Sequence, residues 1–203
     1  MSERALPFTV HVVDDDPSVR DAISLLLSLN GYATSVFASA EDFLAAARAD
    51  APGCAIVDIR MPGMDGLALL GAMKERGIRM PAVVVTAHGD VASARAAFKG
   101  EAVDFLEKPF EEAALLAAVQ ACLARERQRL AVGAEERRRS ESLGALSARE
   151  REVLGQLLQG LHNRDIAERF GISPRTVEVH KARVLAKLGA RNVVDLIRLL
   201  NRA

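Results

Sequence analysis

Residues 57–66 read Val57-Asp58-Ile59-Arg60-Met61-Pro62-Gly63-Met64-Asp65-Gly66, and they decide the fold of this 203-residue chain. A short apolar run from Cys54 to Val57 ends at Asp58. A loop rich in Pro and Gly follows, and apolar residues at helical spacing then occupy 67–73. This pattern predicts a buried strand, a loop and a helix. Because ligands of open parallel sheets bind beyond the carboxyl ends of the strands, Asp58 is a candidate site residue.

The same alternation of strand and helix extends over the first 124 residues. Helix starts are indicated at Asp16-Pro17, where Asp can cap and Pro suits the first helical position, and at Ser39, which begins a capping box. Strands are predicted at 8–13, 34–37, 54–58, 82–86 and 103–107, with helices between them, including 90–99, and a further helix from Glu111. This predicts an α/β, doubly wound, five-stranded parallel sheet with helices on both faces.

Polar residues end several of these strands. Asp14 and Asp15 follow the first strand, Thr86 ends the fourth, and Lys108-Pro109 follows the fifth. Carboxylates that converge on one crevice repel each other, so such a cluster usually holds a hard cation, for which Mg²⁺ fits best. A lysine and a hydroxyl beside it suit a phosphoryl group, and a carboxylate can be the nucleophile. The alternative is a set of unrelated loop carboxylates.

Charge divides the chain into an acidic and a basic part. Residues 1–124 carry 10 Lys and Arg against 17 Asp and Glu, whereas residues 125–203 carry 17 against 10. A basic part suggests an anionic partner such as nucleic acid; the alternative is ordinary solvated surface charge. Cys54 and Cys122 lie in apolar surroundings and are expected to be buried hydrophobes. No signal peptide or membrane span is visible, so a cytoplasmic protein without membrane contact is expected.

Residues 125–145 are predicted to form an exposed helical linker, and residues 146–203 a separate domain of four helices. Ser147 and Glu150 have capping-box spacing. A helix over 163–170, a turn at Gly171 and a helix capped by Ser173 form a helix-turn-helix, whose second helix would enter the major groove. Its polar side carries Arg175, Thr176, Glu178, Lys181 and Arg183. The alternative is a helical hairpin with a basic face that does not bind DNA.

Residues of about 6–124 resemble the receiver domain of two-component response regulators. The spacing of Asp14-Asp15, Asp58, Thr86 and Lys108-Pro109 carries the likeness, and Thr86-Ala87-His88-Gly89-Asp90 and Phe105-Leu106-Glu107-Lys108-Pro109-Phe110 resemble the FixJ-like branch. The resemblance implies a flavodoxin-like fold in which Asp58 accepts a phosphoryl group from a sensor histidine kinase.

The resemblance also implies roles for the residues around Asp58. Asp15 and Asp58 would bind Mg²⁺ directly together with the backbone carbonyl of Arg60, and Asp14 would do so through water. Lys108 would contact the phosphoryl oxygens, Thr86 and Phe105 would act as switch residues, His88 would tune the lifetime of the phosphoryl group, and Lys108–Pro109 would be cis. One departure is Glu101, where relatives usually have Gly; Gly100 can take over that turn.

The second domain resembles the LuxR-type DNA-binding domain, on Ser147–Leu154 and Ile166–His180. The resemblance implies that Glu178, Val179 and Ala182 lie nearest base edges, whereas Arg164, Thr176, Lys181 and Arg183 lie nearer phosphates. His180 is expected to pack or to bond the backbone.

The sequence thus predicts a transcriptional response regulator of the FixJ/NarL type, not an enzyme. Phosphorylation of Asp58 would promote homodimerisation through residues of about 90–123 and binding to double-stranded promoter DNA. One alternative is a Mg²⁺-dependent phosphohydrolase, against which stands Arg60 at the position where an acid/base carboxylate is needed. Another is a DNA-binding protein with a vestigial receiver. The sequence names neither the kinase nor the promoters, and leaves activation against repression, phosphoryl lifetime and autoinhibition open.

Overall fold

A computed structural model describes residues 8–49, 51–87, 97 and 102–201 of the chain. Contacts divide the chain into two units, Met1–Ala131 and Val132–Ala203, and each is described separately below. Within the described residues, no helix combines the length and the apolar character that crossing a membrane requires.

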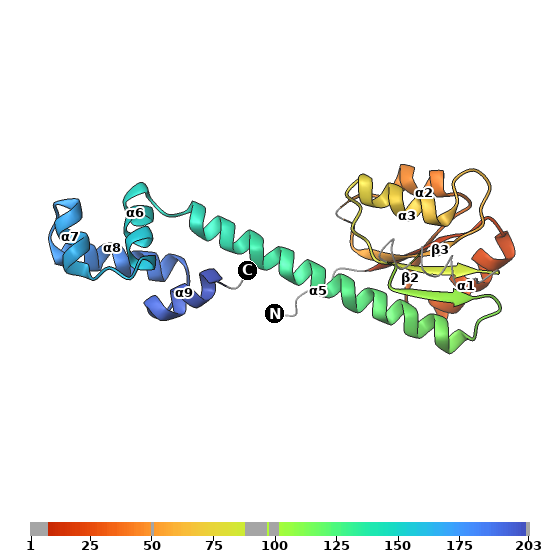
Figure 1. The fold of residues 1–203 in the computed structure, drawn as a ribbon. Coiled ribbons are helices and arrows are strands. Elements are labelled where there is room, and N and C mark those ends of the chain that lie inside the picture. The colour runs from red at the N-terminus through yellow and green to blue at the C-terminus, as the bar shows by residue number, and fades with distance from the viewer. Residues whose placement is uncertain (1–7, 50, 88–96, 98–101, 202–203) are drawn as a thin grey trace. The chain divides into compact units, whose positions relative to one another are not determined.

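The first unit is built on a five-stranded, fully parallel sheet with strand order β2-β1-β3-β4-β5 (Figure 1). This confirms the predicted doubly wound sheet, with strand ends within one residue of expectation. The strands are β1 (Thr9–Val13), β2 (Ala33–Phe37), β3 (Gly53–Asp58), β4 (Ala82–Thr86) and β5 (Asp104–Glu107).

Two cores lie on the two faces of this sheet. The helices are α1 (Pro17–Leu29), α2 (Ala40–Ala46), α3 (Gly66–Glu75) and the first part of α5 (Glu112–Gly144); α2 and α3 cover one face and α1 and α5 the other (Figure 1). Every residue of β3 and β4 is buried, as expected for central strands covered on both sides. Cys54 and Cys122 are free and buried in the core below α5, which confirms their prediction as small hydrophobes.

Local capping bonds fix where the helices begin. The Asp16 carboxylate accepts the Ser18 N–H at 2.8 Å, and the Ser39 hydroxyl accepts the Asp42 N–H at 3.1 Å, as predicted. Asp65 caps α3 by accepting the Ala68 N–H at 2.7 Å. The loop that begins at Asp58 therefore ends in a cap, and α3 starts directly beside the end of β3.

The second unit contains α6 (Ala148–Leu158), α7 (Asn163–Phe170), α8 (Pro174–Lys187) and α9 (Val193–Asn201). Both predicted caps are present: Ser147 and Glu150 form a capping box, and Ser173 accepts the Thr176 N–H at 3.1 Å. Gly171 ends α7 with φ of 63°, which allows the tight turn into α8. The predicted four helices and the helix-turn-helix are confirmed.

The predicted linker is helical, because α5 continues without a break through Gly133 to Gly144. Its first residues are not all exposed, however. The side chain of Glu126 is completely buried and bonds Arg129. This polar stretch predicted a solvated helix face, and that prediction is wrong at Glu126, because its side chain lies among residues of α3 and β4.

Several predictions fall outside the described residues. They concern His88, Gly100, Glu101 and most of the helix predicted over 90–99, of which only Ala97 is described, as a buried helical residue. Much of the first part of the predicted dimer face, which spans residues of about 90–123, also lies outside the described residues.

Glu150 ties the second unit together and predicts how its stability depends on pH. Its carboxylate accepts hydrogen bonds from the Lys187 ammonium at 2.7 Å and from the Ser147 N–H at 2.8 Å, which lower its pKa to about 2. A carboxyl with a depressed pKa stabilises the fold above its unfolded pKa, near 4.5, and this stability is lost as pH falls towards 2. Glu150→Gln should lower the melting temperature at pH 7. Between pH 4.5 and 2, the melting temperature of this variant should decrease less than that of the parent chain.

The measurement is thermal unfolding followed by far-UV circular dichroism. Glu152→Gln is the matched control, because the Glu152 carboxylate pairs with Arg149 on the surface and is 52% exposed. Surface pairs contribute little, so the control should melt almost like the parent chain. Equal melting curves for the two variants would contradict the role given to Glu150.

Candidate functional site: an acidic crevice and a helix-turn-helix

Asp58 ends β3 at the carboxyl edge of the sheet, and its two carboxylate oxygens are held from different sides. The Lys108 ammonium donates to Oδ1 at 2.8 Å, and the Arg60 backbone N–H donates to Oδ2 at 2.7 Å. Asp58 is 5% exposed, so these two bonds hold a carboxylate that is almost completely buried. This geometry presents a fixed, charged oxygen nucleophile.

Lys108 bridges two acidic residues that lie far apart in the sequence. Its ammonium donates to Asp14 Oδ2 at 2.6 Å as well as to Asp58 Oδ1. The Lys108 N–H also donates to the Thr86 carbonyl at 2.7 Å, and the Lys108–Pro109 peptide bond is cis, as predicted. The structure therefore brings Asp14, Asp58, Thr86 and Lys108 together at neighbouring strand ends.

The electrostatics of the crevice follow from burial and from this bridge. Burial raises the pKa of the Asp58 carboxyl, Lys108 lowers it, the charge of Asp14 raises it again, and the net pKa lies above the ordinary value. Burial alone would lower the pKa of the Lys108 ammonium, but its bonds to Asp14 and Asp58 raise it above the ordinary value. Lys108 therefore stays positively charged, whereas burial disfavours the charged form of the Asp58 carboxyl. A further cation beside Asp58 would stabilise its charged form.

Two of the three predicted acidic metal ligands converge. Asp14 is 1% exposed, and its Oδ1 accepts the Asp16 N–H at 2.9 Å, which fixes its side chain. Asp15, the third predicted ligand, is exposed. Over the described ranges, no group of three or more His, Cys, Asp or Glu side chains is placed to hold a metal ion.

The two predicted switch residues occupy neighbouring strands. Thr86, at the end of β4, is completely buried, and its register partner on β5 is Glu107. Phe105 pairs with Val84, is partly buried and packs against the core beneath α2 and α3. Phe105 therefore has the packing of an ordinary core residue at a sheet edge, which is also where a side chain has room to change position.

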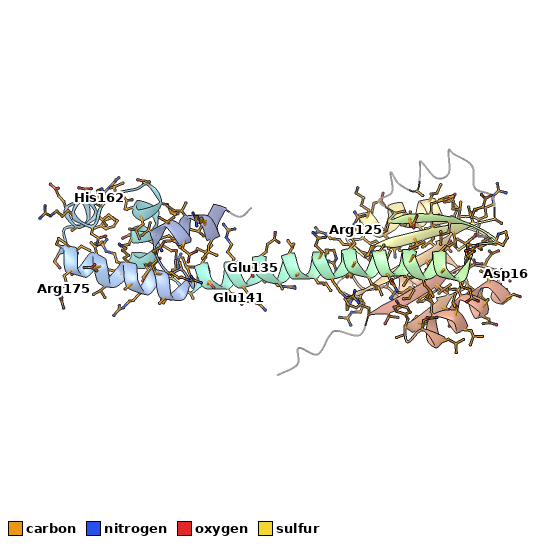
Figure 2. All side chains as sticks on the ribbon, turned by 90° about the horizontal axis from the view of Figure 1, so that it is seen from below. Asp16, Arg125, Glu135, Glu141, His162 and Arg175 are labelled. Carbon is orange, nitrogen blue, oxygen red and sulfur yellow. The ribbon has the colours of Figure 1, made fainter. Side chains whose placement is uncertain are left out.

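The second unit exposes one side of α8. Val177 and Val184 are completely buried and Leu185 and Leu188 are partly buried, so this side of α8 packs into the core of the second unit. The opposite side carries six of the predicted DNA-contacting residues, all of them exposed: Arg175, Thr176, Glu178, Val179, Ala182 and Arg183. Lys181 is half-buried and lies on the side of Val177 and Val184, four residues after the first and three before the second. Arg175 lies in the first turn of α8 (Figure 2).

Arg164 and Lys181 share one shallow hollow. This hollow, of about 530 Å³, lies between the end of α6, the start of α7, α8 and α9, and both side chains line it. Two cations at one hollow can neutralise neighbouring phosphates, which fits the position that the sequence predicted for them. Thr176 is exposed, and its hydroxyl shares a 2.8 Å hydrogen bond with the Ser173 hydroxyl.

Sequence reasoning missed residues that position both sites. The Arg20 guanidinium donates to the Asp14 carbonyl at 2.6 Å, and Glu41 accepts the Met64 N–H at 3.1 Å, which holds the loop after Asp58. In the second unit, the Arg149 guanidinium lies 4.3 Å from the centre of the Phe170 ring. No local signal in the sequence indicated these contacts, because Arg20 lies six residues after Asp14, which is not a helical spacing, and the other contacts join separate elements.

Comparison with known proteins assigns both units. The model of the response regulator receiver domain matches residues 10–120, and that of the luxR family of bacterial regulatory proteins matches residues 144–200. The transcriptional regulatory protein FixJ of Azorhizobium caulinodans is 46% identical over 193 residues, with 94% of this chain and 90% of that protein covered. The C4-dicarboxylate transport transcriptional regulatory protein DctR of Rhodobacter capsulatus is 43% identical, with 96% of this chain and all of that protein covered.

Two solved structures each match 96% of the chain. The response regulator StyR is 37% identical with a TM-score of 0.88, covering 96% of this chain and 98% of that one. Full-length FixJ from B. japonicum is 38% identical with a TM-score of 0.60, covering 96% of each chain. The fold and the acidic crevice define the class, a receiver joined to a DNA-binding module. The chain belongs to the two-component response regulators of the FixJ/NarL type, which are transcription regulators with a LuxR-type helix-turn-helix domain.

Proposed function

We propose that Asp58 accepts a phosphoryl group from a phosphohistidine of a sensor kinase and that this modification switches DNA binding on. One observation carries the proposal: the Asp58 carboxylate, at the carboxyl end of β3, lies 2.8 Å from an ammonium group that also binds Asp14. A carboxylate nucleophile beside a fixed cation is the arrangement that phosphoryl transfer requires, since transfer depends on positioning and charge neutralisation.

In the proposed transfer, an Asp58 oxygen forms a bond to phosphorus while the bond between phosphorus and the imidazole nitrogen breaks. The imidazole keeps the electron pair of that bond and takes up a proton. Lys108 neutralises the charge that the phosphoryl oxygens bring, and the Arg60 N–H holds the second Asp58 oxygen. The residues present fit Mg²⁺, because Asp14 and Asp58 offer hard oxygen ligands and Mg²⁺ usually binds one or two carboxylates and keeps several waters.

Asp58, Asp14, Asp15 and the Arg60 carbonyl would hold Mg²⁺, with the exposed Asp15 side chain turning inward. The bound ion would supply positive charge to the transferring phosphoryl oxygens. Asp14 is already fixed by Arg20 and the Asp16 N–H, so it can orient the site without rearranging.

The proposed switch runs through the ends of β4 and β5. The Thr86 carbonyl accepts the backbone N–H of Lys108. A shift of the Lys108 backbone towards a phosphoryl group would therefore also move the backbone of Thr86. Thr86 would bond the phosphoryl group and Phe105 would repack, which shifts the population towards receivers that pair through residues of about 90–123. Two paired chains would place their α8 helices on half-sites about 34 Å apart.

The test compares the parent chain with Asp58→Asn, with and without acetyl phosphate and Mg²⁺. Gel filtration should show a dimer only for the parent chain with the phosphoryl donor, and fluorescence anisotropy should show tighter binding to a duplex selected from a random pool. If Asp58→Asn dimerises and binds as readily as the phosphorylated chain, the switch is refuted. Turnover of a chromogenic phosphate ester well above one per chain would favour a phosphohydrolase instead.

A further inference from the structure

A second cavity lies within the receiver unit, away from Asp58. It has a volume of about 510 Å³ and lies between the end of α3, the loop that leads into β4, and α5. Small-molecule sites typically have volumes of about 300–1,000 Å³, so the cavity has the size of a ligand site. Arg125, which lines it, and Asp16, beside the acidic crevice, lie at opposite ends of the receiver unit (Figure 2).

One wall of the cavity is apolar. The side chains of Leu70, Met73, Ile78 and Met80 line it, and each is no more than 6% exposed. Because these residues belong to the core beneath α3, the wall is part of a packed structure and offers a fixed surface to a hydrocarbon group.

The opposite wall is cationic and held in place by a buried ion pair. Glu126 is completely buried, and its two oxygens accept hydrogen bonds from Arg129 Nε and Nη2, both at 2.7 Å. A buried ion pair is rarely more stabilising than apolar residues of the same size, so its role here is better explained by what it positions. It fixes the Arg129 guanidinium at the cavity.

The charges at the cavity do not balance. Among the described residues that line it, four are cationic, Lys74, Arg79, Arg125 and Arg129, and one, Glu126, is a carboxylate. An arginine guanidinium matches the two oxygens of a carboxylate better than an ammonium does. Fully hydrated inorganic anions gain nothing from the apolar wall, whereas an anion with a hydrocarbon part can use both walls.

We propose that this cavity binds a small amphipathic carboxylate, with its acid group on Arg79, Arg125 and Arg129 and its hydrocarbon chain on the Leu70–Met80 wall. The cavity shares no lining residue with the acidic crevice around Asp58.

The experiment titrates the full chain with octanoate and follows backbone amide signals by two-dimensional NMR. Saturable shifts are expected at Gly77 and Ile78, which line the cavity, and not at Asp58. Octylamine has the same chain and the opposite charge, so it should produce no saturable shift there. No saturation by octanoate up to about 10 mM, equal shifts with octylamine, or shifts centred elsewhere would each overturn the proposal.

A pair of matched variants tests the cationic wall. Arg79→Gln with Arg125→Gln removes two exposed cations and should weaken octanoate binding by about tenfold or more. Arg137→Gln with Arg138→Gln removes the same charge from exposed positions away from the cavity and should leave the affinity unchanged. Equal weakening by both pairs would mean general charge attraction and would overturn the site. Arg129 is left intact, since its loss would leave Glu126 buried and unpaired.

Discussion

Gly66→Ala should destabilise the receiver unit by about 3 kcal/mol, a large effect for adding one methyl group. A β-carbon at this position would lie 2.2 Å from the Asp58 carbonyl oxygen and 2.9 Å from Val57 Cγ1. The backbone cannot yield easily, because the Gly66 N–H donates to the Ile59 carbonyl at 2.9 Å and the Ile59 N–H donates to β4 at 3.1 Å. The added methyl group must therefore separate α3 from β3 or displace Asp58.

The measurement is urea unfolding followed by tyrosine fluorescence. The chain has one tyrosine, Tyr32, and no tryptophan, so this signal reports the receiver unit alone. With a typical urea dependence for a domain of this size, the midpoint should fall by about 1.5 M. Phosphorylation by acetyl phosphate should also slow, because the carbonyl that meets the new methyl group belongs to Asp58, the proposed phosphoacceptor.

Gly71→Ala is the matched control in the same helix. A β-carbon on Gly71 would meet nothing within 4 Å, and the residue is exposed. Replacing glycine by alanine inside a helix should stabilise the unit by about 0.5–1 kcal/mol. Opposite shifts of the two midpoints are therefore expected. If Gly66→Ala unfolds at the same urea concentration as the parent chain, the close approach of α3 to β3 is wrong.

The sequence predicted the positions of Asp14, Asp58, Thr86 and Lys108 because the reasoning was topological. Each follows or ends a short apolar run, and parallel strands all present their carboxyl ends at one edge. The order of strands and helices is therefore enough to predict that these residues lie together. The same holds for the second unit, where Ser147 and Ser173 mark helix starts through bonds that span only three residues.

The contacts that the sequence did not predict join residues without a periodic relation. Glu41 meets the loop after Asp58 across 23 positions, and Lys187 meets Glu150 across 37. The sequence did not predict the burial of Glu126 for a different reason. Charged residues at helical spacing indicate a solvated face, and only the structure, which places Glu126 at one cavity with residues of α3 and β4, shows that this carboxylate is buried. Pairing of side chains is thus decided by packing, which composition and spacing do not contain.

Arg164→Ala combined with Lys181→Ala should weaken DNA binding by about 10- to 100-fold at moderate salt. Both side chains line the same hollow beside α7 and α8, so both are placed to neutralise neighbouring phosphates. Loss of two phosphate contacts should reduce the slope of log affinity against log salt by about 2. The loss should be nearly the same for selected and scrambled duplexes, because phosphates carry no sequence information.

Fluorescence anisotropy across a salt series measures both quantities, and two comparisons interpret them. Arg137→Ala with Arg138→Ala removes the same charge from exposed positions on α5 and should change the slope little. Glu178→Ala, on the exposed side of α8, should instead alter the preference between duplexes while leaving the salt slope unchanged, since a carboxylate near base edges reads sequence and releases no counterions. A salt slope that stays at the parent value in the Arg164 and Lys181 variant would show that these cations do not reach the phosphates. If the salt slope falls by the same amount in the Arg164 and Lys181 variant as in the Arg137 and Arg138 variant, only net charge matters. The hollow between α6 and α9 would then have no specific role in DNA binding.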